Sequence, residues 1–74
     1  MDEIRLKERL LAESPDFRKL FEEHQLYESR LAALAAKPFL SSAEEFEERG
    51  LKKRKLALKD RMYLMMRDFQ KTQP

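Results

Sequence analysis

The sequence contains no cysteine and no tryptophan, and only one glycine and three prolines. Without cysteine the chain forms neither disulfides nor thiolate metal sites, which fits a reducing compartment such as the cytoplasm. A single histidine, His24, cannot build a multi-histidine metal site, so no metal or other cofactor is expected. Because 74 residues hold so few helix breakers, the composition favours long helices.

Long apolar runs and a large net charge are also missing. The longest apolar runs, 31–36 and 62–66, fall short of the ~18 residues of a membrane-spanning helix. Residues 1–12 alternate acid, base and leucine and lack the apolar core of a signal peptide. The 16 basic and 14 acidic residues leave a net charge of only +2. These features predict a soluble, cytoplasmic protein with one domain, residues 1–74, and no transmembrane segment.

Capping signals divide the chain into helices. Ser14 can cap a helix that has Pro15 at its first position, where no backbone N–H is needed. That helix is expected over 15–36, because Lys37 precedes a proline and is pushed out of the helical region. Ser42 and Glu45 have the spacing of a capping box. A loop over 37–41 and a second helix over 42–70 follow.

Two apolar stripes with steps of three and four residues mark the faces that should meet. The first stripe is Phe17, Leu20, His24, Tyr27, Leu31 and Leu34, and the second is Leu51, Lys55, Leu58, Met62, Met65 and Phe69. Two such stripes joined by a short loop predict an all-α, coiled-coil-like antiparallel helical hairpin. Gly50 lies inside the second helix, where a local bend or a close backbone contact is expected.

The register follows if the turn centres near Phe39. Residue i then faces roughly residue 78 minus i, which pairs Leu20 with Leu58 and Tyr27 with Leu51. The same arithmetic places Leu10 near Phe69, and it brings together the two polar breaks in the stripes, His24 and Lys55. The first stripe continues backwards in phase through Leu10 and Leu6. A short helix over 3–13 is therefore predicted, either separate or joined across a kink at Pro15.

Several apolar residues point away from both stripes. Leu26 does so on the first helix, and residues 62–66 are apolar all round the second. A helix that is apolar on all sides is buried on all sides, and the simplest cover is a second copy of the chain. Folding back of the segment around Ile4 and Leu11 is the competing account. The residues predicted to mediate self-association in an oligomeric bundle are Leu56, Met62, Tyr63, Leu64 and Met66.

A basic stretch over residues 49–61 carries seven bases and one acid. The six that could contact a polyanion are Arg49, Lys52, Lys53, Arg54, Lys59 and Arg61. At ~100° per residue they scatter around the helix, and no aromatic residue lies among them for base stacking. The acids just before them offer pairs at i,i+4 spacing, Glu45 with Arg49 and Glu48 with Lys52. Solvated or intersubunit charge is favoured over contact with nucleic acid.

His24 is the one side chain with an obvious catalytic repertoire. No nucleophile–base pair, glycine-rich loop or metal cluster accompanies it in the sequence. We therefore expect His24 to be a structural residue of the stripe and the protein not to be an enzyme.

The segments Phe17-x2-Leu20 and Glu23-His24, together with the second-helix run 51–63 around Lys55 to Asp60, resemble the YdcH-like family. The resemblance covers about residues 17–67. It implies a short helical hairpin, a bacterial cytoplasmic setting and no established biochemical activity.

The leading interpretation is a small cytoplasmic interaction protein that self-associates and binds a protein partner. One alternative is an accessory protein that binds nucleic acid through residues 49–61. Another is peripheral attachment of the same basic helix to an anionic membrane.

Overall fold

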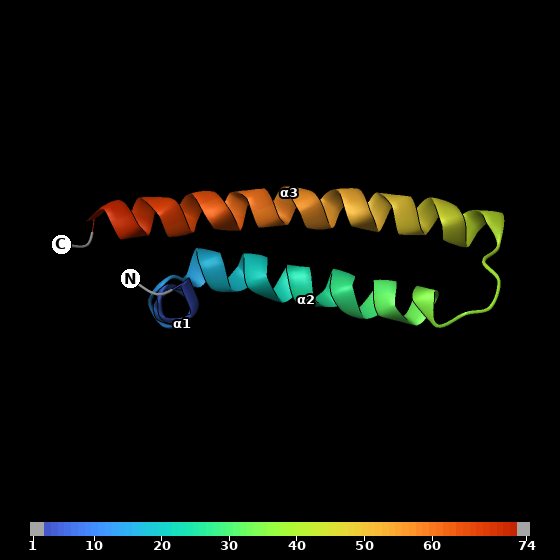
Figure 1. Ribbon diagram of the computed structural model, residues 1–74, viewed down its shortest axis with the longest axis horizontal. Helices are drawn as coiled ribbons and strands as arrows, with labels where there is room; N and C mark the ends of the chain where they lie inside the picture. Colours follow the sequence, from blue (N-terminus) through green and yellow to red (C-terminus); the bar gives the residue numbers. More distant parts are fainter. Residues whose placement is uncertain (1–2, 73–74) are drawn as a thin grey trace.

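The computed structural model describes residues 3–72, and within them the chain forms three helices and no strand. They are α1 (Glu3–Glu13), α2 (Pro15–Ala35) and α3 (Ser42–Thr72). Helices α2 and α3 run antiparallel as a hairpin, and the molecule with α1 has principal extents of 51 × 20 × 16 Å (Figure 1). The predicted all-α hairpin with a short N-terminal helix is confirmed. Residues 1–2 and 73–74, the ends of the predicted 1–74 domain, lie outside the described residues.

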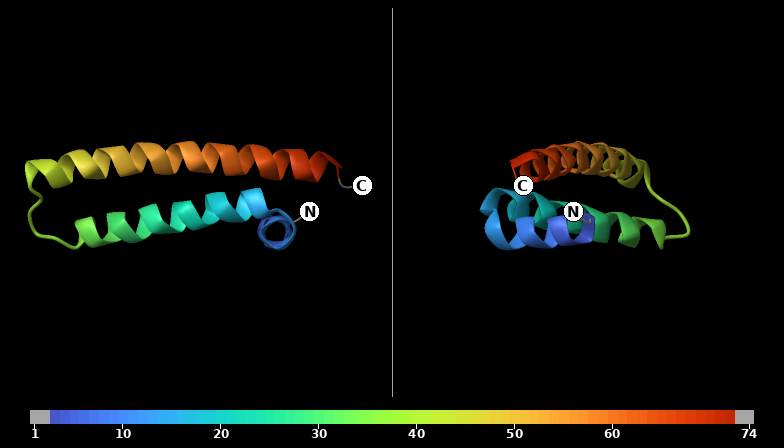
Figure 2. Two further views of the ribbon diagram at one scale, coloured as in Figure 1. Left: turned by 180° about the vertical axis from the view of Figure 1, so that it is seen from behind. Right: turned by 60° about the vertical axis from the view of Figure 1, so that its left-hand side comes forward.

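Helix α1 lies across the open end of the hairpin. It is seen end on in Figure 1 and in the left view of Figure 2, where α2 and α3 are seen from the side. The break comes at Ser14, whose extended backbone (φ −114°, ψ 108°) separates the two helices. The Ser14 hydroxyl accepts a hydrogen bond from the Phe17 N–H at 3.2 Å, and Pro15 occupies the first turn. Of the two arrangements predicted for residues 3–13, the separate helix is the one observed.

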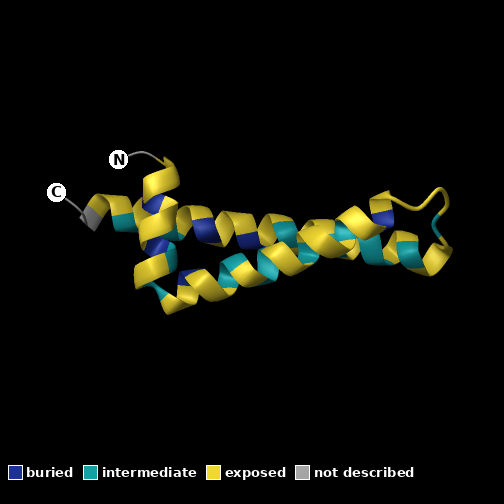
Figure 3. Ribbon diagram, turned by 90° about the horizontal axis from the view of Figure 1, so that it is seen from below, coloured by how far each residue is buried: buried dark blue, intermediate teal, exposed yellow. Residues whose placement is uncertain are grey.

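The buried core is concentrated where the three helices meet. Phe17 is 0% exposed and packs with Leu6 and Leu10 of α1 and Met62 of α3. Figure 3 shows this cluster where α1 crosses the hairpin, with fewer buried positions towards the loop. Leu34 is the buried residue at the loop end of α2. Helix α1 thus packs crosswise against the two-helix hairpin and covers the core at one end.

Both predicted stripes face inward. All twelve of their side chains are buried or half-buried, including the polar members His24 and Lys55. The stripe positions at the ends of the hairpin, Phe17 and Leu34, are almost fully buried. The helical period therefore identified the packed faces of α2 and α3 correctly.

Polar contacts hold the loop end. Arg30 donates to Glu47 through two hydrogen bonds, at 3.0 and 2.8 Å, and Lys37 pairs with Glu44. The capping box lies one residue earlier than predicted. The Ser41 N–H donates to Glu44 Oε1 at 3.0 Å, and the Glu44 N–H donates to Ser41 Oγ at 3.1 Å. Both registers fit the spacing rule, and the additional bond from Lys37 favours the pair that contains Glu44.

Helix α3 runs unbroken through Gly50. A Cβ atom added at this glycine would have no neighbour within 4 Å. The close backbone contact expected there is absent, and Gly50 occupies an open, exposed helical position.

Candidate functional site

The outer face of α3 carries two large apolar side chains that the fold leaves uncovered. Leu56 is 60% exposed and Tyr63 is 65% exposed, although both belong to a helix whose inner face is buried. They are separated by one heptad, so they lie on the same side of α3. This face is turned away from α2, because the inward positions of α3 are those of its predicted stripe.

Charged residues extend this apolar pair along the helix. At about 100° per residue, seven exposed positions between residues 45 and 67 lie within about 40° of Leu56. We call them the outer stripe: Glu45, Arg49, Lys52, Leu56, Asp60, Tyr63 and Arg67. The outer stripe has the three-and-four spacing of a coiled-coil seam, with an apolar centre and charged ends.

Two of the five predicted self-association residues do not lie on a free surface. Met62 is 8% exposed and belongs to the core cluster with Leu6 and Phe17. Met66 is half-buried and packs against the same cluster, because α1 crosses α3 at that level. For Met66, the competing account of cover by the N-terminal segment therefore applies. Leu64, at 45% exposed, joins Leu56 and Tyr63 as an uncovered residue.

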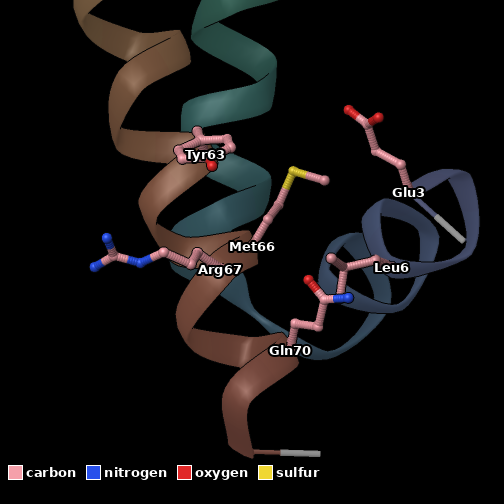
Figure 4. A pocket seen from close by; sticks show the side chains of 6 residues that line it. All are labelled: Glu3, Leu6, Tyr63, Met66, Arg67 and Gln70. Carbon is pink, nitrogen blue, oxygen red and sulfur yellow. The ribbon is translucent and has the colours of Figure 1, made fainter. Parts of the chain in front are cut away.

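A pocket of about 240 Å³ lies beside Tyr63, between α1 and α3. Its lining residues are Glu3, Leu6, Tyr63, Met66, Arg67 and Gln70. Figure 4 shows Met66 pointing towards α1 and Arg67 pointing away from it. Helix α1 thus packs on the Met66 side of α3, and its Glu3 and Leu6 share this pocket with Tyr63 and Arg67 of the outer stripe. The expected fold-back is made by Leu6, Leu10 and Leu11, while Ile4 is 66% exposed.

All six predicted polyanion contacts are exposed: Arg49, Lys52, Lys53, Arg54, Lys59 and Arg61. The expected Glu48–Lys52 pair is present at 3.7 Å, while no Glu45–Arg49 pair within 4.0 Å occurs in the described part of the chain. By helical spacing, four of the bases lie within about 60° of Leu56 on the outer side of α3: Arg49, Lys52, Lys53 and Lys59. Arg54 and Arg61 lie away from that side, so the six bases do not all share one face.

His24 lies on the inner face of α2, with its Nε2 atom buried and without a hydrogen-bond partner among residues 3–72. Burial lowers the pKa of His24 below 6.5, and the positive charges of Lys59, Lys55 and Lys7 act in the same direction. Glu28 opposes them from 4.0 Å, but its carboxylate is already hydrogen-bonded by Lys55 at 3.0 Å. At neutral pH the ring is therefore uncharged, and lysine side chains surround it.

Two exposed aromatic residues were missed from the sequence. Phe39 in the loop is 87% exposed, and Phe46 on α3 is 78% exposed. Phe46 lies out of phase with the inner stripe of α3, and this was the available signal.

None of the helices described over 3–72 is long and apolar enough to cross a membrane. Within that same range, no three His, Cys, Asp or Glu side chains gather as metal ligands would. Neither a curated protein nor a solved structure matches the chain.

Fold and surface together define a small three-helix protein: an antiparallel hairpin capped at one end by a crosswise helix. A family model described as "Protein of unknown function (DUF465)" matches residues 17–66, which span most of α2 and α3. The chain belongs to this family, which is the YdcH-like family that its sequence resembles. The match begins after α1, so the crosswise helix lies outside the matched region.

Proposed function

We propose that the protein is a cytoplasmic interaction protein whose outer face of α3 binds a second copy of the chain. The observation that carries the proposal is the exposure of Leu56 and Tyr63 one heptad apart on that face. Burying a leucine side chain contributes about 1.5–3 kcal/mol, and a tyrosine adds a large apolar area with a polar tip. A domain of this size has little stability to spare, so covering both is a substantial gain.

The resulting oligomer is proposed to act as a helical bundle that presents charged surfaces to a protein partner. Its free edges include the loop end, where Phe39 is 87% exposed and Lys37 pairs with Glu44. We propose no catalytic role for His24, because its ring is half-buried in the packed face between α2 and α3. A turnover by the purified protein that disappeared in His24→Gln would contradict this.

Light scattering at tens of micromolar tests self-association. The wild-type chain should show the mass of an oligomer, and the double substitution Leu56→Glu and Tyr63→Glu should reduce it to 8.9 kDa. Leu26→Glu is the matched control, because Leu26 is 68% exposed on α2 and lies away from the outer stripe. A wild-type mass of one chain would contradict the proposal.

The exposure of all six basic side chains favours a second candidate, binding to nucleic acid. A mobility-shift assay with random duplex decides between them. Micromolar binding with a steep salt dependence, lost in Arg54→Gln with Arg61→Gln, would support this candidate. Those two positions lie off the outer stripe, so the same variant should keep its oligomeric mass.

A further inference from the structure

We propose that two copies pair their α3 helices antiparallel along the outer stripe, with Leu56 at the twofold axis. This inference rests on the proposed self-association and adds its direction and register. It follows from the order of charges along the stripe, because a twofold axis makes each contact occur twice.

With Leu56 on the axis, residue i of one copy faces about residue 112 minus i of the other. Lys52 then faces the partner's Asp60, and Glu45 faces the partner's Arg67. Arg49 comes over the ring of the partner's Tyr63, an arrangement suited to a cation–π contact. Around a central pair of Leu56 side chains, every facing pair in the outer stripe is complementary.

The charges that this register uses are available. Glu45 and Asp60 are exposed, and no ion pair is recorded for either within residues 3–72. Lys52 has a 65% exposed side chain and pairs with Glu48 at 3.7 Å. Arg67 is 49% exposed and touches its neighbour Asp68 at 3.4 Å. Surface pairs of this kind are weak, so both bases can turn to a partner.

Other arrangements place like charges together. A parallel pair in register would set Glu45, Arg49 and Lys52 each against its own copy. Moving the antiparallel axis to between Lys59 and Asp60 would pair Leu56 with Tyr63 but place Lys52 against Arg67. Like charges directly opposed across two helices are unfavourable, so the order of charges selects the axis at Leu56.

The same register accounts for two apolar residues outside the stripe. Phe46 and Leu64 lie on one flank of α3, five helical turns apart, and are 78% and 45% exposed. In the antiparallel pair, equal flanks of the two copies meet, and Phe46 falls next to the partner's Leu64 on each side of the axis. A parallel pair would place these flanks on opposite sides. On the opposite flank of the stripe, the partner's Lys59 approaches Lys52. The repulsion between these two bases is offset by the partner's Asp60, which faces Lys52.

Disulfide cross-linking tests direction and register, because the natural chain has no cysteine to interfere. Leu56→Cys alone should oxidise to a covalent dimer at the axis. Glu45→Cys and Arg67→Cys should each cross-link poorly alone and form a disulfide-linked dimer when mixed. Leu26→Cys is the control for random collision, since that position is exposed but lies off the interface.

A charge swap gives a second readout. Lys52→Glu should weaken the dimer by about threefold to tenfold, and adding Asp60→Lys in the same chain should restore it. Ready cross-linking of Glu45→Cys to itself, at a wild-type dimeric mass, would overturn the antiparallel arrangement and leave self-association intact. Failure of the mixed pair to exceed the Leu26→Cys control would overturn it as well. A monomeric wild-type chain would reject both proposals.

Discussion

The inner and outer faces of α3 both carry large apolar side chains, but the rest of the chain covers only those of the inner face. On the inner face Leu58 and Met62 are 6% and 8% exposed, whereas on the outer face Leu56 and Tyr63 are 60% and 65% exposed. Both faces have the same heptad spacing, set about 140° apart around one helix. The inner face is buried when the chain folds, whereas the outer face stays exposed, and it is there that we propose an interaction between chains.

Helix α1 sets the boundary between these two faces. By crossing the hairpin at Met62 and Met66, it buries one flank of the apolar run in α3 and leaves Tyr63 at the rim. The self-association that we propose would therefore cover less apolar surface than a bare hairpin would offer. In that proposal the charge order of the outer stripe matters for the pairing.

The largest effect is expected from breaking the inner face. Phe17→Ala should lower the free energy of unfolding by about 3–5 kcal/mol, because the ring is fully buried where all three helices meet. Urea denaturation measures the loss. Leu26→Ala should change stability far less, since that side chain is 68% exposed on the same helix. Equal losses in the two variants would mean that α1 does not close the core.

The junction that turns α1 onto this core should give the next effect. Ser14→Ala removes the acceptor of the Phe17 N–H and should cost about 1 kcal/mol. Thermal melting followed by circular dichroism reports the loss. Because threonine can also accept this bond, Ser14→Thr should recover most of the stability, and a failure to do so would argue against the cap.

A substitution at Gly50, which lies on neither of these two faces, should raise the stability of the fold. Gly50→Ala should add about 0.5–1 kcal/mol, because alanine favours the helix and its Cβ atom meets no neighbour within 4 Å. The oligomeric mass should stay the same. Destabilisation would show that the space beside Gly50 is occupied in solution, for instance by a partner chain.

The smallest effect is expected from His24, the polar residue that interrupts the apolar stripe of α2. Because the pKa of His24 in the folded chain lies below 6.5, the unfolded chain takes up the proton first as the pH falls below 6.5. Stability should decrease through that window and level off once the pH passes below the folded pKa. The variant His24→Gln should show no such step in denaturation curves measured from pH 7.5 to 5.

The loss of folding stability at still lower pH has a separate cause. The hydrogen bond from Lys37 and those from Ser41 lower the pKa of Glu44 to about 2. Its contribution is present above pH 4.5 and is lost as the pH falls towards 2. A drop that begins only below pH 4.5 in the wild-type chain would show that His24 adds nothing.

The helical period predicted the two packed faces because it reports which residues lie on one side of a helix. It gave the hairpin and twelve buried or half-buried positions, including His24 and Lys55. The direction of α1 did not follow from the period, since a break at Ser14 leaves the next helix free to turn. Met66 was therefore assigned to the surface and proved to be packed. Ser41 and Ser42 each match a capping box, so spacing alone did not locate the start of α3.

Thermal melting at a series of chain concentrations tests the central claim, that the outer face of α3 is an interface, most directly. The melting temperature of a dimer depends on chain concentration. The wild-type Tm should therefore rise by several degrees as the concentration is raised from one micromolar. In the chain carrying Leu56→Glu and Tyr63→Glu, the Tm should be lower and independent of concentration. A wild-type Tm that stays constant across the series, with cooperative melting, would contradict the claim.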